Sequence, residues 1–219
     1  MLHFDDIKNN PEIRAYIKAA DSSLAALGYT EHSFAHVTLV AERAAHILSA
    51  LGRDARTVEL GRIAAFLHDI GNLVNRIDHS QSGAVMAFVL LNRLGMDAEE
   101  IAQITAAIGN HDEGTGVPVS DIAAALILSD KSDVRRSRVR EVGDLGADIH
   151  DRVNYSATDS SLTVIPEEMS VTLSLTIDET VGSLTDYFEI FLERMLMCRH
   201  AAAKLGLSFH LLINKNQMM

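Results

Sequence analysis

The stretch AFLHDIGN, residues 65–72, ends a helical apolar pattern on two adjacent ionisable residues, His68 and Asp69. Apolar residues before the pair recur at core spacing, and Gly71 is a typical stop for a helix. The pair therefore falls where the apolar stripe meets the protein interior. Burying a carboxylate costs free energy unless it is paired or bound to metal, so the stretch predicts a buried cation site at the end of a helix.

The segments on either side of this stretch have the pattern of further helices. Apolar positions recur at steps of three and four residues, which is typical of amphipathic helices packed on one another. Gly52 and Gly95 have the place of C-terminal stops, and Asp97 and Ser120 have the place of N-caps. We therefore predict a bundle of about six helices with short connections. They cover residues 11–27, 37–51, 55–70, 80–95, 97–109 and 120–138.

The period of the pattern changes toward the C-terminus. Apolar and polar residues alternate in SVTLSLTID, which is typical of a half-buried strand. RVNYSAT and SLTVI predict two earlier strands separated by the turn residues DSS, and LSFHLLIN predicts a last strand after a helix. These elements occupy residues 152–158, 161–165, 170–178, 179–204 (the helix) and 207–214.

Together these patterns predict a mainly α protein with two parts. The helical body covers residues 1–147, and a small α+β appendage covers residues 148–219. In the appendage, one helix is expected to cover the apolar face of an antiparallel sheet.

Composition narrows the class of protein. The formal net charge is -11 over 219 residues, which argues against nucleic-acid polymers and anionic membranes as partners because both would repel the chain. The longest apolar run, residues 83–91, is too short to span a bilayer, and the acidic segment MLHFDDIKNN does not resemble a secretory signal. The single cysteine, Cys198, cannot form an internal disulfide. We expect a buried, inert thiol and a cytoplasmic protein.

Five places in the helical body carry side chains that bind metal ions in proteins. Asp130 follows the apolar run IAAALILS, and His36 lies on the inward side of its helix. A single inward histidine is more often a satisfied core residue than a ligand. Four histidines and two aspartates from separate segments could instead satisfy one another around metal. These residues are His36, His68, Asp69, His79, His111 and Asp130.

The chemistry of this set favours a cofactor of one or two divalent transition metal ions. A carboxylate has two oxygens, so Asp69 could bridge two ions. The ligand sets would be His36, His68 and Asp130 on one ion, and His79 and His111 on the other. Nitrogen and oxygen ligands without cysteine favour Fe, Mn, Zn, Ni or Co. Two such ions would clamp a phosphate and activate a water molecule near neutral pH.

The order of these residues and the segments around them resemble the HD superfamily of metal-dependent phosphohydrolases. The segments are EHSFAHVTLVAERAAHI, AFLHDIGN, DHSQSGA, NHDEG and LILSDKSD, within about residues 30–140. DIHDRVNY, residues 148–155, is similar to a continuation seen in some uncharacterised bacterial and archaeal members. Membership implies an HD-type helical bundle, a site for one or two metal ions and hydrolysis of a phosphoester. By position it implies that His36, His68, Asp69 and Asp130 are the shared ligands, with His79 and His111 as the extra histidines of two-metal members.

The sequence departs from the family pattern in two places. Asn72 stands where many relatives have the lysine of HDIGK, so positive charge for a phosphate must come from elsewhere or be missing. Asp112 stands where relatives that cleave cyclic dinucleotides have a second histidine. The Gly-Tyr-Pro signature of those relatives is absent as well, which argues against a cyclic dinucleotide substrate.

The segment SDKSDVRRSRVR, residues 129–140, gathers positive charge in an acidic chain. One interpretation is a solvated helix end whose cations complement the helix dipole. The other takes Lys131 and Arg135 as phosphate ligands, because they lie nearest to Asp130 along the chain. The predicted substrate-binding residues are Asn72, Lys131 and Arg135, and the predicted catalytic residues are Asp69 and Lys131.

These predictions lead to one main hypothesis and two alternatives. The main hypothesis is a metal-dependent hydrolase in which a metal-activated hydroxide attacks a small phosphoester, either a nucleotide or another phosphorylated metabolite. The first alternative, suggested by His79 and His111, is a phosphodiesterase or dinucleoside polyphosphate hydrolase. The second, suggested by Asn72 in place of lysine, is a non-catalytic metal or nucleotide sensor. The expected partner is a small phosphorylated substrate, and the predicted sheet is compatible with a homodimer.

Overall fold

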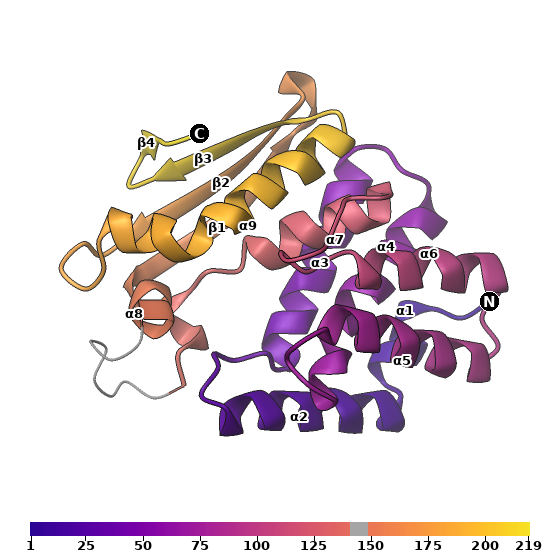
Figure 1. Cartoon of the computed structure of the whole chain (residues 1–219). Coiled ribbons are helices and arrows are strands. Elements are labelled where there is room, and N and C mark those ends of the chain that lie inside the picture. Colours follow the sequence, from indigo (N-terminus) through magenta and orange to yellow (C-terminus); the bar gives the residue numbers. More distant parts are fainter. Residues whose placement is uncertain (141–148) are drawn as a thin grey trace.

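The computed structural model describes residues 1–140 and 149–219, and it consists of a helical body followed by a small sheet with one long helix (Figure 1). The fold class is therefore mainly α with a small α+β element, as predicted. The boundary that we predicted between residues 147 and 148 lies outside the described residues.

The predicted helices are all present in the helical body. The elements are α1 (Phe4–Lys8), α2 (Pro11–Ala26), α3 (Phe34–Ala50), α4 (Ala55–Leu67), η1 (Ile70–Leu73), α5 (His79–Arg93), α6 (Ala98–Gly109), α7 (Asp121–Lys131) and η2 (Arg136–Arg138), where η marks a 3-10 helix. The side chains of Asp97 and Ser120 accept backbone N–H bonds at the starts of α6 and α7, which confirms both N-caps. Gly52 and Gly95 follow α3 and α5 at positive φ, where glycine is favoured.

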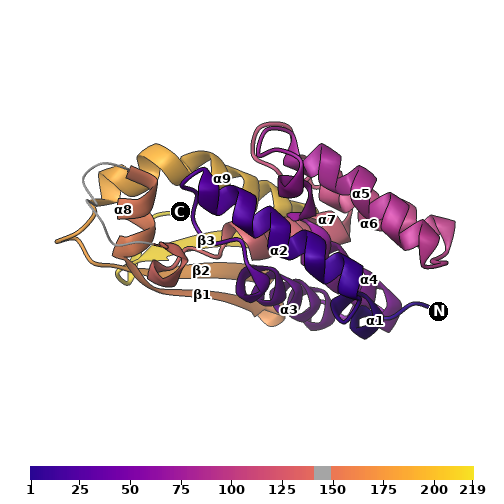
Figure 2. The same ribbon diagram turned by 90° about the horizontal axis from the view of Figure 1, so that it is seen from below.

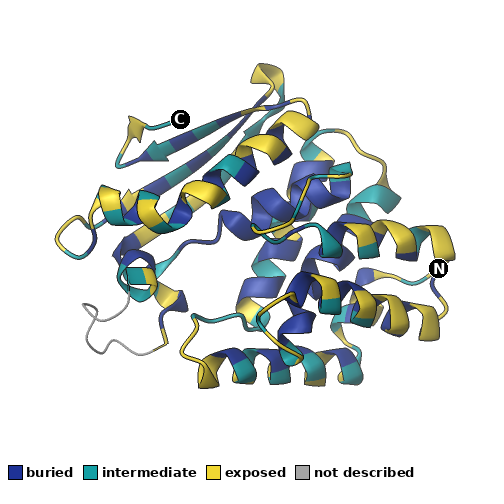
Figure 3. Cartoon of the chain, in the orientation of Figure 1, coloured by how far each residue is buried: buried dark blue, intermediate teal, exposed yellow. Residues whose placement is uncertain are grey.

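Helix α7 lies at the centre of the body, in contact with α3, α4 and α6. Every residue from Ile122 to Lys131 is buried, which explains the nearly continuous apolar sequence of this helix. Figure 3 shows the same concentration of buried residues in the middle of the body and exposed outer faces on α2, α5 and α6. Seen from below in Figure 2, α2 lies across the underside of the body.

The prediction of one helix over residues 120–138 is wrong beyond Lys131. The hydroxyl of Ser132 donates a hydrogen bond to the Ser129 carbonyl, and the Asp133 backbone N–H donates to the Asp130 carbonyl. A serine side chain near a helix end competes for backbone groups in this way and favours a stop. The chain therefore turns after Lys131 and continues into η2.

The C-terminal part contains a four-stranded sheet with the order β1-β2-β3-β4. Its elements are α8 (Ile149–Ser156), β1 (Ala157–Ile165), η3 (Pro166–Glu168), β2 (Ser170–Ile177), α9 (Leu184–Lys204), β3 (Ser208–Ile213) and β4 (Asn216–Gln217). The sheet is mixed, so the prediction of an antiparallel sheet is wrong for one pair: β2 and β3 are parallel. The reason is that α9 returns the chain to the same end of the sheet, as a crossover helix does between parallel strands.

The segment before β2 also differs from its predicted secondary structure. Residues 152–158 were predicted as a strand, but most of them belong to α8, in which Ile149 and Val153 face the core one helical turn apart. The residues DSS at 159–161 were predicted as a turn, but they pair with β2 inside the single strand β1. Because β1 is an edge strand with exposed positions there, its polar residues reflect exposure to solvent and not a turn.

Helix α9 joins the sheet to the helical body. It contacts β2 and β3 and also α7, so one hydrophobic core runs from the bundle into the sheet. Cys198 is buried in α9, as predicted, and burial raises the pKa of its thiol to about 12. Within residues 1–140 and 149–219, no helix is long and apolar enough to cross a membrane.

Candidate metal centre

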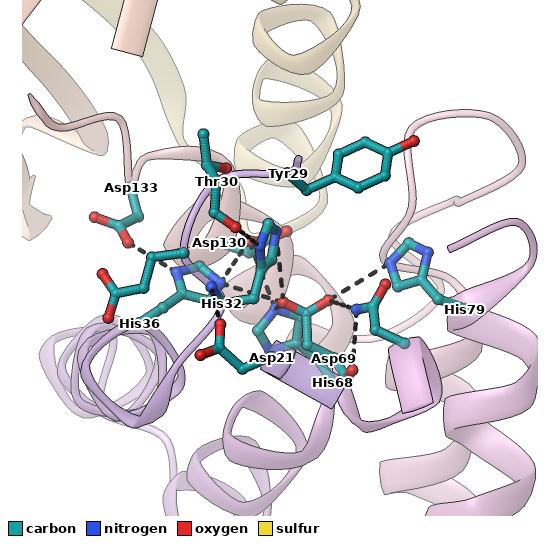
Figure 4. A network of polar contacts seen from close by, with 12 residues as sticks. Asp21, Tyr29, Thr30, His32, His36, His68, Asp69, His79, Asp130 and Asp133 are labelled. Atoms are coloured by element: carbon teal, nitrogen blue, oxygen red, sulfur yellow. Dashed lines mark hydrogen bonds and ion pairs between the residues drawn. The ribbon is translucent and has the colours of Figure 1, made fainter. Parts of the chain in front are cut away.

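Six ionisable side chains converge from the ends of five helices, and Figure 4 shows most of them in one network. All six are at most 6% exposed. Helix ends bring them together because the apolar middles of the helices pack side by side and leave their termini to meet. The residues are His36 in the first turn of α3, His68 and Asp69 directly after α4, His79 at the start of α5, His111 after α6 and Asp130 in the last turn of α7.

Asp69 is the centre of this cluster. Its Oδ2 atom lies 3.5 Å from His36 Nε2 and 3.2 Å from His68 Nε2. Its Oδ1 atom lies 3.6 Å from His79 Nε2. The two carboxylate oxygens therefore face different histidines, which is the arrangement that a bridging carboxylate requires.

The two remaining residues lie on opposite sides of Asp69. Asp130 Oδ1 is 3.4 Å from His36 Nε2 and 3.6 Å from His68 Nε2. His111 Nε2 is 3.2 Å from His79 Nε2. The structure thus brings all six predicted metal ligands into one connected group.

The histidine rings are oriented by acceptors on their outer sides. The Nδ1 atoms of His68, His79 and His111 donate to the carbonyl oxygens of Ala65, Arg76 and Ile108, at 2.7, 3.1 and 2.6 Å. His36 Nδ1 donates to Asp133 Oδ2 at 2.7 Å. A carbonyl oxygen can only accept, so Nδ1 carries a proton and Nε2 is the ring nitrogen that faces the cluster. Acceptors of this kind fix metal-binding histidines in proteins.

The buried atoms that face the centre fit a bound metal ion. Among the residues that the structure describes, His36 Nε2, His68 Nε2 and Asp69 Oδ2 are buried without a hydrogen-bond partner. Leaving buried polar atoms unpaired is costly. Two groups have ligand atoms within 4.8 Å of one another: His36, His68 and Asp130, and His68, Asp69 and His111. A divalent cation would satisfy the unpaired atoms with nitrogen and oxygen ligands.

A protein-family model matches the part of the chain that contains the cluster. The model of the HD domain matches residues 33–138, a range that includes all six residues of the cluster. The chain contains an HD domain.

Two other proteins are similar to this chain over part of their length. An uncharacterized protein of Methanocaldococcus jannaschii is 25% identical over 160 residues, which cover 63% of this chain and 61% of that protein. The chain therefore spans less than two thirds of that relative. A crystal structure of a predicted HD superfamily hydrolase from an uncultured Thermotogales bacterium is 25% identical, with a TM-score of 0.43 over 60% of this chain and 73% of that one.

The electrostatics of the HD domain divide its histidines into two kinds. Burial opposes a charge on His68, but the carboxylate of Asp69 and then Asp130 raise its pKa to about 10. Burial also opposes ionisation of Asp69, but His68 and His32 hold its pKa well below the ordinary value. Burial, by contrast, lowers the pKa of His79 and that of His111, so both are neutral and suited to bind a cation.

The predicted substrate ligand Lys131 is buried beside Asp130. Its Nζ atom is 2.8 Å from Asp130 Oδ2 and 3.2 Å from Glu113 Oε2. Arg194 of α9 donates from Nε to Glu113 Oε1 at 2.7 Å. A chain of alternating charges therefore connects the metal-ligand candidate Asp130 to the C-terminal helix.

The other two predicted substrate residues contact acidic residues of the centre. Asn72 Nδ2 donates to Asp69 Oδ1 at 2.8 Å and to the Asp69 carbonyl at 3.0 Å. This orients the carboxylate and leaves Oδ2 toward His36 and His68. Arg135 donates from Nε to Asp133 Oδ1 at 2.7 Å and from Nη2 to Asp133 Oδ2 at 3.4 Å.

The structure also shows residues that the sequence analysis did not single out. Asp133 orients His36, and a signal existed, because it follows Asp130 by three residues in SDKSD. Arg76 Nη1 lies 3.5 Å from Asn72 Oδ1 and 3.4 Å from His79 Nε2. Among the described residues, no carboxylate forms an ion pair with Arg76. Its position four residues after Asn72 was the only signal in the sequence.

Proposed function

We propose that this HD-domain protein is a metal-dependent hydrolase of a small phosphoester. The observation that carries the proposal is the position of Asp69, whose two oxygens face different histidines in a buried cluster. Divalent transition metal ions bound there would polarise a phosphoryl group and activate a water molecule as the nucleophile. The residues that would hold them are His36, His68, Asp69 and Asp130 for one ion, and Asp69, His79 and His111 for a second.

Residues around the ligands have orienting roles in this proposal. Asp133 and Asn72 hold His36 and Asp69 in the geometry needed to bind a cation. Lys131 offsets the negative charge of Asp130 and so limits repulsion between an anionic substrate and the carboxylates. These contacts are built into the fold, so the site does not have to reorganise when the substrate binds.

Arg76 is the proposed source of positive charge for the substrate phosphate. It touches Asn72, which occupies the position of the lysine in related HDIGK motifs, and it lies beside His79. A guanidinium can donate two parallel hydrogen bonds to phosphate oxygens. Arg76 would therefore replace the missing lysine from a position four residues further along the chain, in the connection between η1 and α5.

The placement of His79 and His111 supports a second candidate within the same chemistry. Their Nε2 atoms meet at 3.2 Å on the Oδ1 side of Asp69, where a second ion would bind. A pair of ions can stabilise both the attacking and the leaving oxygen of a phosphodiester. A phosphodiesterase or dinucleoside polyphosphate hydrolase is therefore the second candidate.

Metal analysis followed by an assay panel tests the proposal. The protein is reconstituted separately with Fe, Mn, Zn, Ni and Co, its metal content is measured by elemental analysis, and hydrolysis of phosphomonoesters and phosphodiesters is assayed. We expect at least one ion per chain and hydrolysis that disappears in Asp69→Ala together with metal binding. Asp159→Ala on the exposed edge strand is the matched control. Stable metal binding without hydrolysis of any phosphoester would overturn the hydrolase and favour a sensor.

A further inference from the structure

A cavity of about 530 Å³ lies next to the metal-ligand cluster. Two residues of its lining also reach the cluster. His32 Nε2 is 4.0 Å from Asp69 Oδ2, and Arg76 Nη1 is 3.4 Å from His79 Nε2. This volume is in the range of small-molecule binding sites. The cavity can therefore hold the rest of a molecule whose phosphate lies at the cluster.

The outer wall of the cavity comes from the C-terminal part of the chain. Asn154 of α8 and Ile190, Phe191 and Arg194 of α9 line it, opposite Tyr29 in the connection between α2 and α3. Phe191 is buried and Tyr29 is exposed. Because Asn154 and Arg194 line the cavity together with these rings, the wall combines apolar surface with polar groups. The α+β element therefore shapes the space beside the HD-domain ligands.

Arg138 contributes a buried cation to the cavity lining. It is only 2% exposed. Its Nε donates to the Glu31 carbonyl and its Nη1 to the Asp133 carbonyl, both at 2.9 Å. Its Nη2 is buried without a hydrogen-bond partner among the described residues. A buried guanidinium with an unused donor is costly, and an anionic group of a ligand would satisfy it.

Arg194 contributes a second cation from α9. Its Nε donates to Glu113, and its guanidinium lies 4.8 Å from the centre of the Phe191 ring. The bond to Glu113 engages one edge of the guanidinium. A guanidinium carries five N–H donors in a planar fork, so the other edge can still donate to a ligand.

The balance of charge in the lining also favours an anion. The arginines are Arg76, Arg138 and Arg194, and the acids are Glu113, Asp151 and Glu193. Glu113 is matched from behind by the buried Lys131. Apart from Glu113, the lining therefore has three arginines and two acids. This local excess of positive charge contrasts with the net charge of -11 for the whole chain.

We propose that this cavity is a specificity subsite for the organic part of the phosphoester, and that Arg138 and Arg194 there bind a second anionic group of the substrate. The inference rests on the proposed function for the position of the scissile phosphate. The second group is a carboxylate or a second phosphate, because both present the oxygens that a guanidinium binds. The α+β element would then select the substrate, while the HD-domain ligands carry out the chemistry.

Matched pairs of compounds test the inference on the full-length, metal-loaded protein. Phosphoglycerate is compared with glycerol phosphate for a carboxylate, and adenosine bisphosphate with adenosine monophosphate for a second phosphate. For each pair we measure the ratio of kcat/KM values and the ratio of binding constants from calorimetry. We expect one pair to favour its more anionic member, and Arg194→Gln to reduce that preference about 10- to 100-fold.

Three further variants separate charge recognition from effects on the cluster. Arg194 and Lys131 are connected through Glu113. Glu113→Gln weakens this connection but leaves the guanidinium of Arg194 in place, so both members of a pair should lose activity equally. Arg199→Gln removes a charge from the exposed side of the same helix and should change nothing. Arg138→Lys keeps the charge but replaces the guanidinium fork with a single ammonium group, and it should reduce the preference as well. Its fold is checked by circular dichroism, and the Arg194 variant decides the matter if Arg138→Lys does not fold.

The possible outcomes separate the inference from the proposed function. Hydrolysis without preference in either pair, or a preference that Arg194→Gln leaves unchanged, overturns the inference and leaves the hydrolase standing. Preferential binding of the more anionic compound without hydrolysis, when lost in Arg194→Gln, supports the subsite and overturns the hydrolase. Neither hydrolysis nor selective binding overturns both.

Discussion

His36 Nδ1 and Asp133 Oδ2 lie 2.7 Å apart, although 97 residues separate them in the sequence. Behind this contact, Asp133 pairs with Arg135 at 2.7 Å and with Arg138 at 3.9 Å. His36 and Arg138 hold the pKa of Asp133 far below its ordinary value, against the effect of burial. An ionised Asp133 therefore keeps the proton of His36 on Nδ1 and directs Nε2 toward Asp69.

Removing the negative charge of Asp133 should weaken metal binding. In Asp133→Asn the ring of His36 loses its anionic acceptor, and we expect the metal affinity to fall about 10- to 100-fold, as for other outer partners of metal-binding histidines. Titration against a chelating dye measures the change. Glu167→Gln, which removes an equal charge from an exposed position, is the control. Unchanged affinity in Asp133→Asn would mean that packing alone orients His36.

Arg76 should matter for catalysis but not for the metal content. In Arg76→Gln the guanidinium that we assign to the phosphate is lost, and we expect kcat to fall roughly 100-fold, as after removal of one donor to a transition-state oxyanion. Arg76→Lys should recover part of the activity because it keeps the charge. Steady-state kinetics and elemental analysis are measured on the same samples. A parallel loss of metal would show that Arg76 supports the ligands and not the substrate.

Gly71 is required for the packing of η1 on α5. A methyl group at this position would overlap the backbone of His79 and of Gly83. Because backbone atoms cannot move aside cheaply, we expect Gly71→Ala to lower the free energy of unfolding by about 1–3 kcal/mol. Urea denaturation measures it. In the control Gly109→Ala, the new methyl would meet Ala84 at an ordinary 3.6 Å. Equal stability of both variants would contradict the close approach.

The stability of the metal-free protein should fall as the pH rises from 7 to 9. The pKa of His68 is raised from 6.5 to about 10 in the folded chain, so its protonation stabilises the fold. This contribution is complete below the unfolded pKa and is lost as the pH rises through the folded one. We expect a loss of up to about 1 kcal/mol per pH unit, measured by urea denaturation with a chelator present.

Metal loading should remove this pH dependence. A histidine nitrogen must be deprotonated to bind a cation, so the metal displaces the Nε2 proton of His68. The affinity of the protein for the metal should therefore rise from pH 7 to 9. Denaturation of the metal-loaded protein is therefore the matched measurement. A flat or rising stability curve for the metal-free protein would show that His68 is neutral without metal.

Most of the helical body was predictable because its pattern is local. The apolar periodicity of α3 to α7, and caps such as Asp97 and Ser120, depend on residues three or four positions apart. The end of α7 was less predictable, because the hydroxyl of Ser132 and the backbone N–H of Asp133 bond to carbonyls of the last helical turn, and charge and periodicity do not reveal these bonds. The polar residues at the start of β1 were misread as a turn because they mark the exposure of an edge strand, and most of the strand predicted at residues 152–158 belongs to α8.

The sequence by itself determined which residues form the candidate centre. An aspartate after eight apolar or small residues, or a histidine and aspartate at the end of an apolar helix, indicates a buried charge that requires a partner, and this holds wherever the helix is placed. Only the tertiary structure decided how the centre is held. The contacts of Asp133 and Arg194, and the parallel pairing of β2 with β3, join residues distant in sequence, and no local pattern records which chain ends meet after the helices have packed.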